Sequence, residues 1–433
     1  METNATRMCA LLVGLPAINV LGIENGVGEG PLRIHVETIA GVVGCAGCGT
    51  RAWLKDQRPV ALVDLPAFGR PALLVWHKRR WRCPEAACEV KTFTEHAPAI
   101  AAPRAGVTDR AGRWMTRQVG QGQPVSTVAA ELGCDWHTVM DAVLAYGTPL
   151  IEDPDRIGEV SALGLDETLF VRSGAFKRRA WVTSVLDVTR PAQLLDVVEG
   201  RTAKAPSEWI EARPAAWRAG IAWAALDLSG PYRKTFNDSL PDAVQVADPF
   251  HVTKLANTRL DDVRRRVQQE TLGRRGRKDD PLYRSRRLLT MGHERLDEKG
   301  NQKLLSLLEA GDPHGEVRMA WHAKETLRGL YDQPAEAAPG YLAELIEALL
   351  DGDMPGELRQ LGRTLRHWAD QIVAWHQAQI SNGPTEAMNS LIKKVKRVGH
   401  GFRRFRNYRL RVLLCAGQPN WDLLATVTPA PPP

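Results

Sequence analysis

Apolar and polar positions alternate along short segments of the first hundred residues, as they do in half-buried strands. Residues 32–37 (Leu-Arg-Ile-His-Val-Glu) alternate strictly, and residues 72–76 form an apolar run that leads into a basic stretch. The apolar segment 8–23 is interrupted by a proline and an asparagine, so we expect a buried strand or loop there rather than a secretory signal. The pattern predicts a unit of short strands over residues 1–100.

A helical period replaces this alternation over residues 101–150. Residues 124–133 predict a helix with Ser126 or Thr127 near its N-cap and a glycine at its end, and Asp135 is a candidate cap for a second helix. The spacing is that of a helix-turn-helix, although similar helical hairpins occur in proteins that never bind DNA. Three side chains lie at the front of the second helix, where base edges would be met: Trp136, His137 and Thr138.

Buried-strand patterns return after residue 151, and two of them lead into an acid. Residues 160–165 precede Asp166, and residues 223–226 precede Asp227. The other predicted elements are strands over 177–187, 192–198 and 244–248, a helix over 204–219 and a helix from residue 231. This order predicts an α/β chain with the mixed sheet of a ribonuclease-H-like fold.

The acids after these strands are candidate metal ligands. If the strands are parallel neighbours, Asp166 and Asp227 meet at one sheet edge, where metal ions held between carboxylates can activate water or a 3′-hydroxyl. Glu386 opens a basic helix far downstream. Asp248 also follows a strand and competes with Asp227; we assign Asp248 and His251 a supporting role beside the metals. The alternative for this pair is a helix cap with a half-buried histidine.

Residues 252–375 are nearly all helical in pattern, which predicts a long helical insertion before the last acid. Its densest basic stretch contains candidate contacts to DNA phosphates: Arg264, Arg265, Arg274, Arg275 and Arg277. A charge run of this kind is more commonly a solvated helix face, so both interpretations stay open. The basic helix after Glu386 adds three more candidates: Lys393, Lys396 and Arg397.

Four of the seven cysteines form two close pairs: Cys45 with Cys48, and Cys83 with Cys88. Four thiolates on two such turns can hold one structural Zn²⁺ in a tetrahedron. The alternative is two cysteine pairs in an apolar core, against which the neighbouring glycines and proline argue. Between the pairs, Arg79 and Arg80 precede Trp81 and are predicted to contact DNA, unless this strand face is merely solvated.

Composition agrees with a nucleic-acid partner. The chain has 433 residues, enough for two or three domains, and a formal net charge of +7, which favours polyanions. Paired rather than dispersed cysteines fit a reducing compartment. Because no run of 18 or more apolar residues occurs, we expect no transmembrane helix and a cytoplasmic protein.

Several motifs together resemble the ISL3 family of bacterial insertion-sequence transposases, over nearly the whole chain. The matching segments are the two cysteine pairs, Asp166-Glu167, Asp227–Tyr232, Pro241–Ala243 with Asp248–His251, Ser381–Asn389, Ile392-Lys393, Arg397 and Gly401-Phe402. The chain departs from the family at Ala387, where glycine is usual, and at Pro249, where a basic residue is usual. Neither departure removes a carboxylate.

The resemblance implies a DDE-type transposase that binds the ends of an insertion sequence, cleaves there and joins the 3′ ends to target DNA. Asp166, Asp227 and Glu386 would hold Mg²⁺ or Mn²⁺, as two ions, and double-stranded DNA at two ends would require at least a dimer. A DNA-binding protein without catalysis and a stand-alone nuclease are the alternatives. The expected domains are a zinc ribbon (1–100), a helix-turn-helix (101–150), a catalytic domain (151–251 and 376–418), a helical insertion (252–375) and a tail (419–433).

Overall fold

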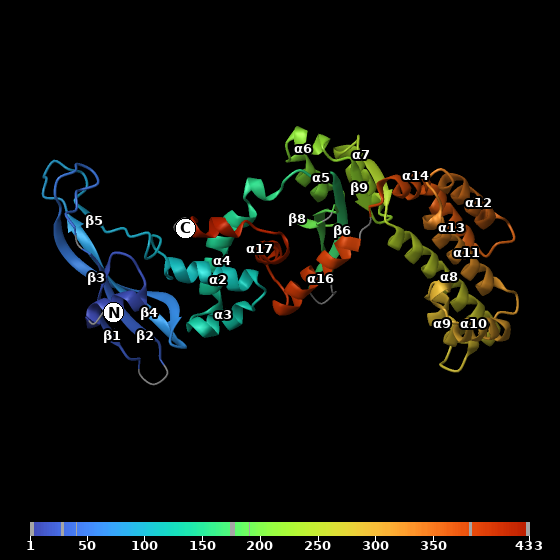
Figure 1. Ribbon diagram of the computed structural model, residues 1–433, viewed down its shortest axis with the longest axis horizontal. Helices are drawn as coiled ribbons and strands as arrows, with labels where there is room; N and C mark the ends of the chain where they lie inside the picture. The colour runs from blue at the N-terminus through green and yellow to red at the C-terminus, as the bar shows by residue number, and fades with distance from the viewer. Residues whose placement is uncertain are drawn as a thin grey trace. The chain divides into compact units, whose positions relative to one another are not determined.

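The structure, a computed structural model, describes residues 4–26, 30–39, 41–173, 178–189, 191–380 and 383–429 (Figure 1). The chain divides into two compact units, each described here by itself. The first comprises Met1–Gly158 and Ser390–Pro433, and the second comprises Glu159–Asn389. Residues 390–418, which we expected beside the catalytic sheet, therefore group with the N-terminal unit. None of the described helices combines the length and apolar character that a membrane span requires.

The first unit contains a five-stranded sheet with the order β1-β2-β4-β3, and β5 pairs with β4. The strands are β1 (Ile18–Glu24), β2 (Leu32–Thr38), β3 (Trp53–Ala67), β4 (Arg70–Arg82) and β5 (Thr92–Thr94). Strands β3 and β4 form a long antiparallel hairpin rather than the short strands that we predicted. Val36, Leu74 and Trp76 lie in the apolar core of this sheet.

A helix precedes the sheet where we predicted a strand or loop. Helix α1 (Ala5–Val13) packs near β1. The Asn4 side chain caps it by accepting a hydrogen bond from the Arg7 amide, and Gly14 ends it with a left-handed φ of 64°. These two end signals divide the apolar run 8–23 between a helix and β1.

Four helices complete the first unit: α2 (Asp109–Gly120), α3 (Val125–Leu132), α4 (Trp136–Ile151) and α17 (Phe405–Ala416), with a short turn of 3-10 helix at Pro154–Arg156. The turn between α3 and α4 passes through Gly133, whose φ of 63° favours glycine, and Asp135 caps α4 as predicted. Ser126 and Thr127 lie near the N-cap of α3 as predicted, but neither caps the helix. Pro124 occupies the N-cap position without a side-chain bond, and Ser126 and Thr127 lie inside the helix.

The segment that we predicted as a C-terminal tail is packed as far as residue 429. A 3-10 helix (Trp421–Ala425) follows α17, and Leu424 and Val427 are buried. The Trp421 ring lies so close to Gly120 that a Cβ there would come within 2.4 Å of it. This segment packs against α4 as well as Gly120, so apolar burial orders it as far as residue 429. Residues 430–433 lie outside the described part.

The second unit is built on a mixed sheet with the order β10-β9-β6-β7-β8. Its strands are β6 (Ala162–Ser173), β7 (Arg178–Asp187), β8 (Gln193–Glu199), β9 (Trp223–Leu226) and β10 (Val244–Ala247). β6, β7 and β8 are antiparallel neighbours, whereas β9 runs parallel to both β6 and β10. This arrangement agrees with the predicted α/β class.

Three helices connect the strands of this sheet: α5 (Lys204–Glu211), α6 (Ala215–Ala219) and α7 (Gly230–Ser239). The single helix that we predicted over 204–219 is two helices. Pro214 occupies the N-cap position of α6 with an extended ψ of 144°. A proline lacks an amide donor and cannot continue the preceding helix, which explains the break.

Asp166 lies inside β6 rather than at the end of a strand, contrary to our prediction. The parallel pairing of β6 with β9 stops at Leu165 opposite Leu226. On the other side, antiparallel pairing with β7 continues to Ser173. The parallel pairing of β6 with β9 therefore ends at Leu165 even though β6 itself continues to Ser173.

The insertion is a helical layer that follows β10. Its helices are α8 (Pro249–Leu272), α9 (Pro281–Thr290), α10 (Glu298–Gly311), α11 (Glu316–Gly329), α12 (Ala338–Leu350), α13 (Gly356–His367), α14 (Ala369–Val373) and α15 (Trp375–Ala378), with short 3-10 turns at His293–Arg295 and Leu330–Asp332. The long helix α8 packs against α11 and α13. α16 (Gly383–Val398) follows the insertion.

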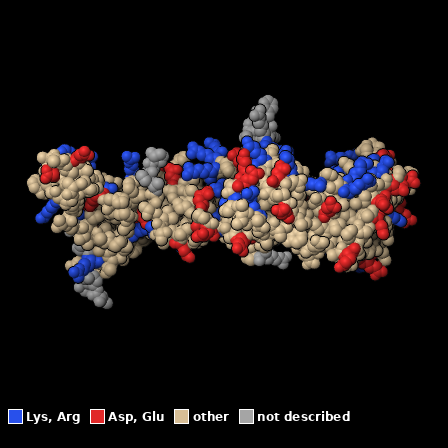
Figure 2. Space-filling model, turned by 90° about the horizontal axis from the view of Figure 1, so that it is seen from above, with Lys and Arg blue, Asp and Glu red and all other residues tan. Residues whose placement is uncertain are grey.

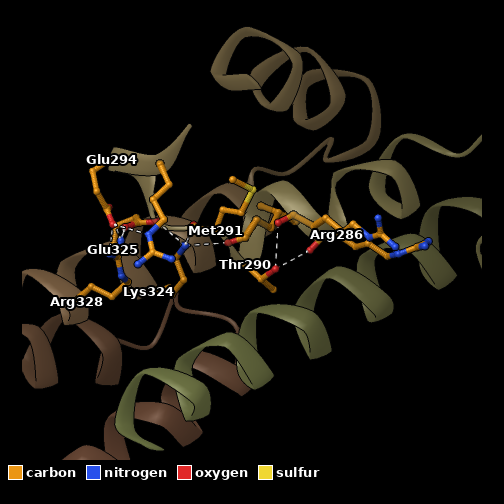
Figure 3. Close-up of polar contacts among 10 residues, drawn as sticks. Arg286, Thr290, Met291, Glu294, Lys324, Glu325 and Arg328 are labelled. Atoms are coloured by element: carbon orange, nitrogen blue, oxygen red, sulfur yellow. Dashed lines mark hydrogen bonds and ion pairs between the residues drawn. The ribbon is translucent and has the colours of Figure 1, made fainter. Parts of the chain in front are cut away.

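A buried lysine fastens the end of α9 to α11. The Lys324 side chain is 1% exposed, and its Nζ donates to the carbonyl oxygens of Leu289 (2.8 Å) and Met291 (2.7 Å). Glu325 pairs with the same ammonium group, and Arg328 bonds to Glu294 and Glu325 (Figure 3). The cation thus satisfies carbonyl groups that the end of a helix leaves without partners.

Candidate active site and metal centres

Asp166 and Asp227 lie at the same level on neighbouring parallel strands. Leu165 pairs with Leu226; Asp166 is the next residue of β6, and Asp227 directly follows the last residue of β9. Both side chains are half-buried. The structure thus brings together two acids that are about 60 residues apart, as the strand pattern predicted.

Electrostatics couple these two carboxylates. Burial, and then the negative charge of Asp166, raise the pKa of Asp227 to about 6, whereas the charge of nearby His251 lowers it. The Oδ1 atom of Asp227 is buried and has no hydrogen-bond partner among the described residues. An unpaired buried carboxylate oxygen is costly, and a bound cation would remove both the repulsion and the missing interaction. The pair therefore fits a divalent metal, for which carboxylate oxygens are the preferred ligands.

Asp248 and His251 lie at the start of α8, directly after β10. Asp248 is 3% exposed and caps the helix by accepting from the His251 amide (3.3 Å). The Nδ1 atom of His251 is 2.9 Å from the same carboxylate oxygen. This hydrogen bond, opposed by burial and reinforced by the charges of Asp248, Asp227 and Asp166, raises the pKa of His251. The pair is thus both a helix cap and a charged neighbour of the acids.

Asn389 of α16 orients Asp166, a role that the strand patterns did not predict. Its Nδ2 donates to Oδ2 of Asp166, and its Oδ1 accepts from the Thr168 hydroxyl at 3.2 Å. The other oxygen of Asp166 accepts from the Glu167 amide at 2.7 Å. Asn389 is 8% exposed. Its position one helical turn after Glu386 was the available signal, because residues three apart share a helix face.

Glu386 lies in the first turn of α16, but its side chain lies outside the described part of the structure. The same holds for the side chain of Thr385. α16 already includes Gly383, so Thr385 lies within the helix rather than before it. Ser381 and Asn382, which open the motif, also lie outside the described residues.

The four paired cysteines come together at one point of the first unit. The Sγ atoms of Cys45 and Cys88 are 3.7 Å apart, those of Cys48 and Cys83 are 3.5 Å apart, and all four lie within 4.8 Å of one another. Zn–S bonds of about 2.3 Å in a tetrahedron place sulfurs about 3.8 Å apart. The cluster therefore fits one zinc ion, as the sequence predicted.

The surroundings of the cysteines support a metal rather than a plain apolar core. Hydrogen bonds from Thr50 lower the pKa of Cys48 to about 6, and backbone hydrogen bonds at Gly47 and Cys48 lower that of Cys45. Burial instead raises the pKa of Cys83. A Cβ on Gly47 would come within 2.9 Å of Val90 and 3.3 Å of the Cys88 sulfur, so the turn requires glycine.

At the front of α4, Trp136 and His137 are exposed, Trp136 to 40%. Thr138 is half-buried, and both its amide and its hydroxyl bond to Asp135, at 2.8 and 3.0 Å. Thr138 thus completes the helix cap, and only its two predecessors present free surface for a base edge.

The two arginines predicted to bind DNA between the cysteine pairs are engaged within the protein. Arg79 is 6% exposed and bonds to Glu37 and Thr38, so the structure contradicts its predicted DNA contact. Arg80 forms two hydrogen bonds with Asp56, at 2.8 and 2.6 Å. We missed the exposed residues of the Arg80 face, Trp53, Arg58 and Arg82, which lie opposite or beside it in the register. Strand alternation around Arg80 was the signal that separates this face from that of Arg79.

The cations of the insertion differ in what they contact. Arg264 is 6% exposed and pairs with Asp261, which also pairs with the exposed Arg265. Arg274 pairs with Asp280, whereas Arg275 and Arg277 have exposed side chains. On α16, Lys393 and Arg397 are exposed and Lys396 is half-buried. Figure 2 shows Lys and Arg in patches interspersed with acidic residues.

Comparison with known proteins places these features in one order along the chain. Residues 163–412 match the DDE transposase profile of the ISL3 type, residues 95–147 match the helix-turn-helix domain of transposase family ISL3, and residues 41–88 match the zinc-finger of transposases IS204/IS1001/IS1096/IS1165. The transposase for insertion sequence element IS1001 of Bordetella parapertussis is 26% identical, over 88% of this chain and 90% of its own. That for element IS1557 of Mycobacterium tuberculosis is also 26% identical, over 83% and 82%.

Proposed function

This chain belongs to the ISL3 family of insertion-sequence transposases and is a DDE-type transposase, and from that premise we propose how it acts. It cleaves DNA at the ends of its element and joins the freed 3′ ends to target DNA, without a covalent enzyme intermediate. The observation that carries the proposal is the side-by-side placement of Asp166 and Asp227, with a buried Asp227 oxygen that lacks a hydrogen-bond partner among the described residues.

Asp166, Asp227 and Glu386 would hold two divalent cations, Mg²⁺ in the proposal. Such ions supply activation of water or a 3′-hydroxyl and stabilisation of the leaving oxygen. The protein contributes orientation. Asn389 and the Glu167 amide hold the two oxygens of Asp166, whereas Asp227 keeps one oxygen available. Glu386 joins this site in the proposal because it stands one helical turn before Asn389.

His251 would position the DNA phosphate. Its hydrogen bond to Asp248 raises its pKa and favours the imidazolium form, which can pair with a phosphate oxygen beside the acids. Asp248 is then a positioning residue rather than a metal ligand, because its carboxylate already caps α8 and holds the histidine. We retain Asp227 as the second catalytic acid on this ground.

We propose that the sheet of the second unit is a ribonuclease-H-like sheet. Three antiparallel strands followed by two parallel strands on the other side of the first strand support this assignment. The insertion would then span 252–375, and the helix with the last acid would return after it.

The zinc ribbon and the helix-turn-helix would recognise the ends, the latter through Trp136 and His137. Exposed cations at Lys393 and Arg397 would contact phosphates, and two ends would engage a dimer.

A cleavage and joining assay tests the proposal. The substrate is labelled duplex carrying the DNA that flanks the coding sequence, incubated with the zinc-loaded chain, Mg²⁺ and a target plasmid. We expect nicks at the element ends and then joined products. Binding without nicking would identify a DNA-binding protein without catalysis, and nicking without joining, or without preference for the ends, would identify a nuclease.

A further inference from the structure

The helical insertion contains a hollow of about 530 Å³ between α8, α9 and the loop that joins them. Helix α8 contributes Arg264, Arg265 and Gln268 from one face, as the spacing of three and four residues requires. The loop contributes Arg275, and α9 contributes Arg286. The volume lies in the range of small-molecule sites, about 300–1,000 Å³, so it exceeds what a lone phosphate would fill.

The charge of the hollow favours an anion. Four arginines line it, and Asp261 is its single acidic lining residue. Asp261 pairs with Arg264 and Arg265. Two of the arginines, Arg264 and Arg286, are not part of a flexible surface run, because one is buried and the other packs over an aromatic ring. A phosphate group is the anion that such guanidinium groups bind best.

A stacking surface and an amide accompany this charge. The Arg286 guanidinium lies 3.8 Å from the centre of the Tyr283 ring, which leaves a flat cation as a surface on which a base can stack. The Gln268 side chain is 5% exposed, and its Oε1 is buried with no hydrogen-bond partner among the described residues. An acceptor oxygen requires a donor, which a phosphate lacks and a base amino group supplies.

The hollow is held by rigid neighbours. Lys324 fastens the C-terminal end of α9, and in Figure 3 the Arg286 side chain extends away from that cluster along the helix. On the loop side, Gly276 lies directly against Gln268. A Cβ at this glycine would fall 1.8 Å from the Gln268 amide nitrogen. Glycine 276 thus makes room for the amide, and a methyl group there would displace it.

We propose that this hollow binds one unpaired nucleotide of a DNA strand, with its phosphate on the arginines and its base against Arg286 and Gln268. The inference rests on the proposed function, since it assigns a part of the DNA substrate to the insertion. A fully paired strand keeps its bases inside the duplex and cannot place one in a hollow, whereas an unpaired nucleotide is free to enter.

The test compares two labelled duplexes of the same sequence, one fully paired and one with a single unpaired nucleotide, by fluorescence anisotropy. We expect the wild-type full chain to bind the second about tenfold more tightly, the size of one base-stacking contact. Gly276→Ala should abolish this preference and leave affinity for the paired duplex unchanged. Gly340→Ala is the matched control, because it adds the same methyl group to the insertion where nothing lies within 4 Å.

A second variant, Arg275→Gln, tests the hollow independently in case Gly276→Ala misfolds. Arg284→Gln is its control. Arg284 is exposed on α9, the helix that also carries Arg286, and does not line the hollow. Of these two arginine variants, only Arg275→Gln should weaken binding of the unpaired nucleotide and lower its salt dependence by about one phosphate contact. The inference is overturned if wild type shows no preference, or if Gly276→Ala or Arg275→Gln retains it. Cleavage at element ends by the same wild-type preparation keeps that outcome distinct from failure of the proposed function.

Discussion

The chain contains two candidate metal centres that differ in how their ligands are placed. The cysteine cluster is closed: four sulfurs from two short turns lie within 4.8 Å of one another, which leaves no position for a substrate. The candidate acid site is open, with its acids on separate strands and one Asp227 oxygen without a hydrogen-bond partner in the described structure. A structural ion completes a fold, whereas a catalytic ion would offset an unfavourable charge arrangement that the fold maintains.

Replacing an acid of the open site should have the largest effect. We expect Asp227→Asn to reduce end cleavage by at least about 10³-fold, or about 4 kcal/mol of activation free energy, while end binding persists. The same change removes a buried, repelled charge and should raise the free energy of unfolding of the metal-free protein at pH 8, by about 2 kcal/mol. Gel assays and urea denaturation measure the two quantities.

Asp238→Asn is the matched control, because Asp238 is exposed and pairs only with Lys234 in the described structure. It should change neither quantity. If Asp248→Asn abolishes cleavage and Asp227→Asn stays active, the assignment of the second acid is wrong.

A cysteine of the closed site should behave in the opposite way. Cys83→Ser is expected to lose zinc and destabilise its module, because metal-binding free energy is folding free energy in such sites. End binding should then weaken by about a hundredfold, while the second unit remains folded by circular dichroism. Cys415→Ser, remote from the cluster in sequence, should retain one zinc per chain by elemental analysis. Wild-type protein purified without chelators and free of zinc would disprove the site.

Asn389 tests whether the open site depends on orientation as well as charge. Asn389→Ala removes the amide that holds Asp166 and should lower the cleavage rate by about 10- to 100-fold, the usual cost of losing a partner of a metal ligand. Raising the Mg²⁺ concentration should recover part of the loss. Asn301→Ala, at a half-buried asparagine of α10 in the insertion, is the control. An unchanged rate and Mg²⁺ dependence in Asn389→Ala would show that the contact has no role in orientation.

The smallest expected effect is a pH dependence of stability. Because the pKa of Asp227 is about 6 in the folded chain and about 3.9 when exposed, the folded state holds its proton more tightly between these values. The contribution of protonated Asp227 to the free energy of unfolding is therefore fully present below pH 4 and is lost as the pH rises through 6. Mg²⁺ binds the deprotonated form, so at tenfold excess over Kd it should stabilise the folded state by about 1.4 kcal/mol at pH 8 and raise the melting temperature there, but barely at pH 5.

Thermal melts at both pH values with and without Mg²⁺ measure this shift, and Asp227→Asn provides the reference in which it should vanish. An equal Mg²⁺ effect at pH 5 and pH 8 would place the ion elsewhere. The cysteine cluster should not contribute to this difference between pH 5 and pH 8, since its four sulfurs are already bound to zinc.

Short sequence patterns predicted the local structure of this protein better than they predicted which polar side chains are exposed. Asp135 caps α4 as expected, and Asp248 caps α8, which was the alternative to its supporting role; a cap depends on a side chain and amides three residues away. The cysteine pairs and the strands that lead to the acids follow equally short patterns. The break at Pro214 shows the limit: the helical composition around it suggested one helix, and the backbone required two.

The sequence by itself determined the candidate ligands, the cap at Asp135, the strands that lead to the acids and the resemblance to a family, because each is written in contiguous residues. Only the tertiary structure decided which polar side chains are available. Arg79 is engaged by Glu37, 42 residues away, and Asp166 by Asn389, 223 residues away. Burial and hydrogen bonding depend on segments that meet only after folding, so a cation in a strand pattern can be a DNA contact or an internal ion pair. For the same reason the sequence did not predict the hollow beside Gln268, because its lining residues come from two helices and a loop.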